Sequence, residues 1–220
     1  MNVNEPSNSL ARVLAIVPAA GRSRRMGQAK QLLNIGGRPM LECVVEPLLA
    51  ASLQGVLVVT HSALAAQLAE KLGALGVACG EPGRIAVAIN DDPASEMIDS
   101  IRIGLRWWMR EAAPGDRARD EDGFLVCPAD QPGLRVGDIE LCVAAFRLDP
   151  TRVVIAAHEG REGHPIIFPA ALAVFVESPA CDGGLRELPR VHPDLVTRVD
   201  LATDAATRNI NTPEDYDRLR

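Results

Sequence analysis

Hydrophobic residues in this sequence gather in short continuous runs, and longer segments of helical character lie between them. The apolar runs predict strands at Val13–Val17, Gly55–Thr60, Ile85–Ile89, Phe124–Pro128, Val153–Ala157 and Pro165–Phe168. The intervening segments predict helices at Pro39–Leu53, Ala63–Leu75, Ile98–Glu111, Val136–Phe146, Ala170–Val176 and Thr212–Leu219. Several strands are apolar throughout instead of alternating, so both faces of the sheet are expected to be buried. The pattern predicts an α/β fold, doubly wound, with a mostly parallel sheet and helices on both faces.

The length of 220 residues suits one domain, which we expect over residues 11–220. Residues 1–10 are polar and predict a flexible tail. The charged, turn-rich segment Ala113–Gly123 is interpreted as a surface loop and not as a domain boundary.

Composition limits the kinds of partner and the cellular compartment that we expect for this chain. The net charge of -6 argues against general nucleic-acid binding, which needs a broad basic face. No apolar run approaches the roughly 20 residues of a membrane span, so no membrane partner is expected. The five cysteines form no C-x-x-C pair, and the first residues do not resemble a signal peptide. An odd cysteine count then favours the reducing cytoplasm.

The most informative segment follows the first predicted strand. The strand breaks at Pro18, and the loop after it contains Gly21 and Gly27. Four cations stand in the same loop: Arg22, Arg24, Arg25 and Lys30. Ligands of open α/β sheets bind beyond the carboxyl ends of strands, where this loop lies. Glycines let the backbone approach an anion and cationic side chains neutralise it, so the loop predicts a polyphosphate site.

Two better-known phosphate loops do not match this segment. A P-loop requires G-x-x-x-x-G-K-[ST], whereas Gln28 and Ala29 separate Gly27 from Lys30 and no Ser or Thr follows. A dinucleotide fingerprint requires G-x-G-x-x-G, which is also missing. A kinase or a dehydrogenase is therefore disfavoured, and a solvated basic turn stays as the structural alternative.

A second polar feature ends the predicted strand that begins at Phe124. Asp130 follows this apolar run directly. A carboxylate there is costly unless a cation neutralises it, and Mg2+ on a nucleotide phosphate is a suitable cation. The alternative is a capping carboxylate that begins the turn before Pro132.

Four segments together resemble a known family. AAGRSRRMGQAKQLL is similar to the signature loop of the MobA-like nucleotidyltransferases, and more narrowly of the molybdenum cofactor cytidylyltransferases. CPADQP resembles their metal-binding turn, GREGHPIIF their G-x-x-G-H-P segment, and NINTPEDY their C-terminal D-I-D-T-P-E-D. The segments follow the family's order from Leu14 to Leu219.

The resemblance implies a Rossmann-like nucleotidyltransferase fold of the glycosyltransferase-A type, and it assigns roles to individual residues. The implied nucleotide-binding residues are Ala19, Ala20, Gly21, Arg22, Ser23, Arg24, Arg25, Gly27, Lys30 and Ser100. The implied catalytic residues are Arg25, Lys30 and Asp130, and the implied acceptor-binding residues are Gly163, His164 and Pro165. Asp130 and Asn211 would hold Mg2+. Ala20, in an A-A-G loop, favours CTP over GTP.

The expected reaction moves CMP from CTP onto a phosphorylated acceptor such as molybdenum cofactor and releases pyrophosphate. A molybdoenzyme is then the implied recipient of the product. A phosphate acceptor is already anionic near neutral pH, because its second pKa is about 6, so no general base is needed. Catalysis would rest on positioning and charge neutralisation.

Two departures from the family pattern leave the acceptor open. Glu96 and Asp99 stand where the family has small residues, which places negative charge near the expected nucleotide unless a cation such as Arg102 compensates. Asn209 and Asn211 replace the acids of D-I-D-T-P. The alternatives are a transferase for a sugar phosphate, polyol phosphate or phospholactate, and a non-catalytic chaperone that binds a nucleotide or cofactor.

Overall fold

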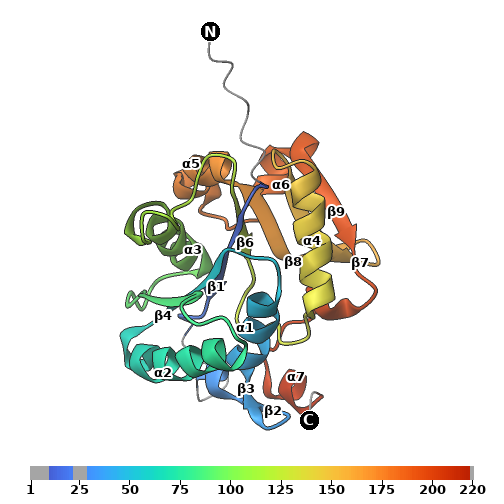
Figure 1. Ribbon diagram of the computed structural model, residues 1–220. Helices are drawn as coiled ribbons and strands as arrows, with labels where there is room; N and C mark the ends of the chain where they lie inside the picture. Colours follow the sequence, from blue (N-terminus) through green and yellow to red (C-terminus); the bar gives the residue numbers. More distant parts are fainter. Residues whose placement is uncertain (1–9, 22–28, 219–220) are drawn as a thin grey trace.

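A seven-stranded sheet forms the centre of the molecule, which we describe from a computed structural model (Figure 1). The structure describes residues 10–21 and 29–218. Arg22, Ser23, Arg24, Arg25 and Gly27 therefore lie outside the described residues. Most of the predicted tail and the predicted helix end at Leu219 lie outside them as well.

The sheet is mostly parallel, as the apolar runs predict. Its strands, in spatial order, are β5 (Ile85–Ile89), β4 (Gly55–Thr60), β1 (Val13–Pro18), β6 (Gly123–Val126), β8 (Arg161–Pro169), β7 (Val153–His158) and β9 (Val196–Asp200). Strands β5, β4, β1 and β6 pair in parallel, and so do β7 and β9. Only β8, among these strands, runs antiparallel to its neighbours.

Helices cover both faces of this sheet, so the doubly wound α/β prediction is confirmed (Figure 1). One apolar core lies beneath α1 (Met40–Ala50), α2 (Ser62–Ala78) and α4 (Val136–Leu148). The other lies beneath α3 (Met97–Arg106), α5 (Ala173–Glu177) and α6 (Glu187–Val191). Successive residues of a strand point to opposite faces, so a central strand such as β1 has to be apolar at nearly every position. No helix among residues 10–21 and 29–218 combines the length and the apolar character needed to cross a membrane.

The predicted helix Ile98–Glu111 changes character at its end. Helix α3 stops at Arg106, and a π-helical turn continues from Trp107 to Glu111. Trp108 is buried and donates its indole N–H to the Ala15 carbonyl at 3.2 Å, while Trp107 packs edge-on against it. The wide turn thus coincides with the burial of one tryptophan beneath the other.

Several short elements lack a strong sequence signal. They are the ribbon of β2 (Asn34–Ile35) and β3 (Arg38–Pro39), helix α6, and strand β9. β9 lies at the sheet edge with alternating burial, so it has no apolar run to mark it. The short 3-10 turns are Lys30–Leu32, Ala170–Leu172, Pro179–Cys181, Pro193–Leu195 and Asp204–Ala206. The second of these replaces the start of the helix predicted over Ala170–Val176, and α5 continues it.

The last helix, α7 (Pro213–Asp217), begins as its sequence predicts. The Thr212 hydroxyl accepts a hydrogen bond from the Asp215 N–H at 3.2 Å. The Asp215 carboxylate accepts one from the Thr212 N–H at 3.0 Å in return. This reciprocal cap fixes the direction of the chain just after Asn211.

Candidate active site

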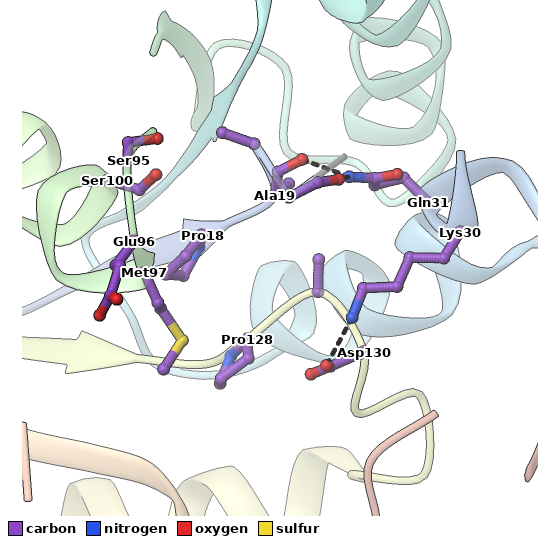
Figure 2. Close-up of a pocket in the computed structure, with 13 residues that line it drawn as sticks. Pro18, Ala19, Lys30, Gln31, Ser95, Glu96, Met97, Ser100, Pro128 and Asp130 are labelled. Atoms are coloured by element: carbon purple, nitrogen blue, oxygen red, sulfur yellow. Dashed lines mark hydrogen bonds and ion pairs between the residues drawn. The ribbon is translucent and has the colours of Figure 1, made fainter. Parts of the chain in front are cut away.

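A cleft of about 210 Å³ opens where β1 and β6 end side by side (Figure 2). Register places these strand ends together, because Ile16 pairs with Val126. The residues that line the cleft are Pro18, Ala19, Ala20, Gly21, Lys30, Gln31, Ser95, Glu96, Met97, Ser100, Pro128, Ala129 and Asp130. The chain thus brings together the sequence-predicted residues Ala19, Ala20, Gly21, Lys30, Ser100 and Asp130.

The charged end of this cleft is built from three segments that are distant in sequence. The Lys30 ammonium lies 2.7 Å from Asp130 Oδ2 and 3.4 Å from Asn211 Oδ1. Both side chains of the Lys30–Asp130 pair are largely buried, with 18% and 13% of their surface exposed. The Asp130 carbonyl also accepts the Ile210 N–H at 2.9 Å, which holds the C-terminal segment against this turn. The two predicted metal ligands, Asp130 and Asn211, therefore face the same cation.

The Asp130 carboxylate is directed at Lys30, although the sequence alone also allowed a turn cap. The hydrogen bond that closes its turn runs from the Gln131 N–H to the Pro128 carbonyl at 3.3 Å. Asp130 Oδ1 is buried and has no hydrogen-bond partner among the residues that the structure describes. A buried carboxylate oxygen without a partner is costly, so this atom indicates a place for a ligand cation or donor.

The oxygens at this end of the cleft fit Mg2+. Asp130 offers a carboxylate and Asn211 an amide oxygen, and hard oxygens of this kind are what Mg2+ prefers. No group of three or more His, Cys, Asp and Glu side chains that could hold a metal occurs among the described residues. A metal here would therefore complete its coordination with water or phosphate oxygens.

Gln31 is a site residue that sequence reasoning missed. Its side chain is almost fully buried, and Nε2 donates to the Ala19 carbonyl and to the Gly21 carbonyl, the latter at 3.0 Å. The side chain thereby fixes the backbone at the start of the cationic loop. The only signal in the sequence was a polar residue between Lys30 and the apolar pair Leu32 and Leu33.

The acidic departures at Glu96 and Asp99 occupy different places. Glu96 is exposed and lines the cleft, as its position predicts. Asp99 does not line it, because its carboxylate turns back to accept the Glu96 N–H at 2.8 Å. Arg102 lies 3.8 Å from Asp99 and 2.7 Å from Asp182. Of the two acids, Glu96 therefore lines the cleft, and Asp99 has Arg102 beside it as the compensating cation that the sequence analysis named.

The predicted acceptor segment forms an irregular part of β8. Ile155 pairs with Ile166 and Ala157 with Glu162, so Gly163, His164 and Pro165 together oppose a single residue of β7. Such bulges redirect side chains near functional sites. The peptide bond between His164 and Pro165 is cis.

His164 and Gly163 have different environments within this bulge. Burial lowers the pKa of His164 to about 4, although the nearby Asp130 carboxylate acts in the opposite direction. The imidazole is therefore neutral near neutral pH, and its buried Nε2 has no hydrogen-bond partner among the described residues. Gly163 has a packing reason to be glycine, because an added Cβ would lie 1.9 Å from the Ala206 carbonyl oxygen.

The two amides of the C-terminal motif, Asn209 and Asn211, make different contacts. Asn209 Oδ1 accepts a hydrogen bond from Gln131 Nε2 at 2.7 Å, and Gln131 Nε2 also donates to the Ala206 carbonyl at 3.0 Å. Asn209 therefore joins the C-terminal segment to the Asp130 turn. Asn211 is the one of the two that accepts a hydrogen bond from Lys30.

Comparison with known proteins agrees with the resemblance seen in the motifs. A family model described as the MobA-like NTP transferase domain matches residues 15–196. The purine catabolism protein PucB of Bacillus subtilis (strain 168) is 28% identical over 209 residues, which is 94% of this chain and 96% of that protein. The 2-C-methyl-D-erythritol 4-phosphate cytidylyltransferase of Frankia casuarinae is 32% identical over 183 residues, covering 81% of this chain and 55% of that protein.

The fold recurs in solved structures. A nucleotidyl transferase from Methanothermobacter thermautotrophicus superposes with a TM-score of 0.73, over 95% of this chain and 96% of that one, at 24% identity. At this level of identity the superposition supports the fold, which is the Rossmann-like fold that the motifs imply.

Proposed function

Because this chain belongs to the MobA-like NTP transferase family, we propose that it moves CMP from CTP onto a phosphorylated small-molecule acceptor and releases pyrophosphate. The observation that carries this proposal is the convergence of Lys30, Asp130 and Asn211 at one end of the cleft. This arrangement places a cation that can bind phosphates beside oxygen atoms that can bind a metal. The enzyme class, a nucleotidyltransferase of the MobA-like kind, is the part that the family establishes.

CTP is the proposed donor for two reasons. Ala20, which lines the cleft, belongs to the A-A-G form of the loop that resembles the cytidylyl-specific members. A relative with 32% identity bears the name of a cytidylyltransferase. In this proposal Ala19, Ala20 and Gly21 lie along the base and sugar, while Lys30 and Arg25 hold the phosphates.

The reaction needs little proton transfer. An oxygen of the acceptor phosphate forms a bond to the α-phosphorus of CTP, and the bond from that phosphorus to the bridging oxygen breaks, so pyrophosphate leaves with the electron pair. The attacking oxygen is already ionised near neutral pH. His164 is neutral there because its pKa is about 4, so it adds no charge to the acceptor side. Lys30 neutralises charge that develops on the departing pyrophosphate.

We propose Mg2+ as the metal, with Asp130 and Asn211 as its protein ligands. When bound, Mg2+ supplies charge neutralisation and fixes phosphate oxygens in place. In the structure Lys30 neutralises Asp130. Phosphates that attract Lys30 would release this carboxylate for the metal.

The acceptor is proposed as molybdenum cofactor, with a molybdoenzyme receiving the product. A polyol phosphate is the second candidate, since a relative is named as a cytidylyltransferase for 2-C-methyl-D-erythritol 4-phosphate. The exposed carboxylate of Glu96 at the cleft gives a physical reason to test smaller acceptors, because it disfavours additional negative charge nearby.

Pyrophosphate release tests the proposal. The purified chain is incubated with Mg2+ and each of CTP, GTP, ATP and UTP, with molybdenum cofactor or 2-C-methyl-D-erythritol 4-phosphate as acceptor. We expect acceptor-dependent release with CTP, and the more active acceptor identifies the substrate class. Binding of CTP without release from any phosphorylated acceptor would instead favour the non-catalytic chaperone and overturn the enzyme proposal.

A further inference from the structure

At the end of the cleft away from Lys30, the hydroxyl group of Ser100 is buried and hydrogen-bonded. Ser100 lies in the first turns of α3 and lines the cleft, although only 2% of its surface is exposed. Figure 2 shows Ser100 and Ser95 on the side of the cleft opposite Lys30 and Gln31. If phosphates lie at Lys30, this far end is where a nucleobase would lie.

Ser100 is held by a buried residue from another element. Asn90 follows β5 directly, and its N–H donates to the Thr60 carbonyl at 2.7 Å, which extends the pairing of β5 with β4. The Asn90 side chain is also buried, with 6% of the residue exposed. Its Nδ2 donates to Ser100 Oγ at 2.9 Å. The hydrogen bond therefore joins the rigid sheet edge to the wall of the cleft.

This contact determines the hydrogen-bonding polarity of Ser100. A serine hydroxyl has one proton and two acceptor lone pairs. Asn90 uses a lone pair, so the proton is left for another partner. Among residues 10–21 and 29–218, no group accepts that proton. A buried donor without a partner is costly, so a ligand acceptor at this point gains affinity.

We propose that Asn90 is a positioning residue that presents Ser100 as a hydrogen-bond donor to the nucleobase and so favours cytosine over guanine. This inference rests on the proposed function, because it requires a nucleotide in the cleft. Cytosine offers two adjacent acceptors, O2 and N3, on its pairing edge. Guanine offers two donors, N1–H and N2–H, beside its single acceptor O6. A fixed donor in the cleft therefore strengthens the binding of cytosine and weakens the binding of guanine in most of its orientations.

A purely structural role for Asn90 predicts a different result. The bond between Asn90 and Ser100 would then only tie β5 to α3, and its loss would weaken the fold and every nucleotide complex alike. The ratio of affinities for CTP and GTP separates the two roles, since general destabilisation cancels in that ratio.

The decisive variant is Asn90→Asp, which keeps the shape of the side chain and reverses the direction of its hydrogen bond with Ser100. A carboxylate at this position accepts the Ser100 proton, so that only lone pairs face the cleft. The added negative charge repels all triphosphates similarly, and this effect also cancels in the ratio. We expect the ratio of the dissociation constants for GTP and CTP, measured by calorimetry with Mg2+, to fall about tenfold, or about 1.4 kcal/mol.

The control is the same substitution in a Ser100→Ala background. Without the hydroxyl, Asn90→Asp should leave the ratio unchanged, because the effect of Asn90 passes through Ser100. Ser100→Ala alone should lower the ratio, which keeps the test available if Asn90→Asp does not fold.

The outcomes distinguish this inference from the proposed function. An unchanged ratio in both Asn90→Asp and Ser100→Ala, with CTP still bound, overturns the role of Asn90 and leaves the transferase intact. An equal fall in the ratio for Asn90→Asp with and without Ser100 also overturns it. A wild-type chain that binds neither nucleotide overturns both proposals.

Discussion

The Lys30 ammonium lies 2.7 Å from the Asp130 carboxylate, although 100 positions separate these residues along the chain. Each residue follows a central strand at the carboxyl edge of the sheet, Lys30 after β1 and Asp130 after β6. The parallel pairing of these strands brings the two residues together. Lys30 belongs to the predicted polyphosphate loop and Asp130 to the predicted metal-binding turn, so two separate predictions meet in one ion pair.

Removing either member of this pair should abolish most turnover. We expect Lys30→Ala and Asp130→Ala each to lower kcat by about 10²- to 10³-fold, since each removes a group that neutralises developing charge or holds the metal. Steady-state pyrophosphate release measures this, with circular dichroism to confirm the fold. The matched control is Lys71→Ala, which removes the other lysine of the chain from an exposed position on α2. Near-normal turnover in either site variant would remove that residue from the mechanism.

Lys30 should also compete with a metal in the nucleotide-free chain. Its ammonium occupies the position that Asp130 and Asn211 both face, so Mg2+ has to displace it. We expect Mg2+ without nucleotide to raise the Tm of Lys30→Gln more than that of the wild type, because binding to the folded state stabilises it. Asp130→Asn in the Lys30→Gln background should remove the extra shift. Equal Mg2+ shifts in wild type and Lys30→Gln would show that the two cations do not share this position.

Gln31 should contribute to both stability and nucleotide binding. Replacing it with Met keeps the length of the side chain but leaves the Ala19 and Gly21 carbonyls without their donor. We expect the free energy of unfolding to fall by about 1–3 kcal/mol, with a weaker affinity for CTP. Urea unfolding and calorimetry measure the two effects. Gln67→Met, at an exposed position of α2, is the control, and a similar small loss in both variants would contradict the role of Gln31.

Gly163 should not tolerate even one added methyl group. A Cβ there would meet the Ala206 carbonyl oxygen at 1.9 Å, so Gly163→Ala has to displace the Asp204–Ala206 turn. We expect a loss of stability of about 1–3 kcal/mol or more from this overpacking. Gly137→Ala is the control, since its Cβ would meet nothing within 4 Å on the exposed side of α4. A Gly163→Ala chain as stable as wild type would show that the bulge is loosely packed.

The His164 imidazole, whose Nε2 is buried, should make stability depend on pH. Its pKa is lowered to about 4 by burial, against an ordinary value of 6.5. Below pH 6.5 the unfolded chain therefore binds a proton that the folded chain does not, and stability is lost as the pH falls towards 4. Between pH 7 and pH 5 we expect wild type to lose roughly 1–2 kcal/mol more than His164→Asn, measured by urea unfolding. Identical losses would mean that His164 is solvated.

The sequence predicted the centre of this fold better than its edges. Strands such as β1 and β4 are apolar at almost every position, because both of their faces are covered. Strand β9 has one exposed face, and Thr197 and Arg198 interrupt any apolar run there. A half-exposed edge strand of this kind has no local signal apart from a weak alternation.

The sequence predicted that Lys30 and Asp130 lie at the same edge of the sheet, but it did not predict the contacts made there. Lys30 and Asp130 stand in motifs, so their shared location follows from strand order. The direct contact between the two side chains does not follow from strand order, since the motifs assign Lys30 to phosphate and Asp130 to a metal. Gln31 and Asn90 act by fixing other groups through hydrogen bonds, which no spacing along the chain reveals.

The proposed function requires the cleft beside Lys30 and Asp130 to bind CTP together with Mg2+. Thermal denaturation of the wild-type chain with each of CTP, GTP, ATP and UTP, with and without Mg2+, tests this most directly. We expect CTP with Mg2+ to give the largest rise in Tm, and we expect Asp130→Ala to remove the contribution of Mg2+. A Tm that no triphosphate raises, with or without Mg2+, would contradict it.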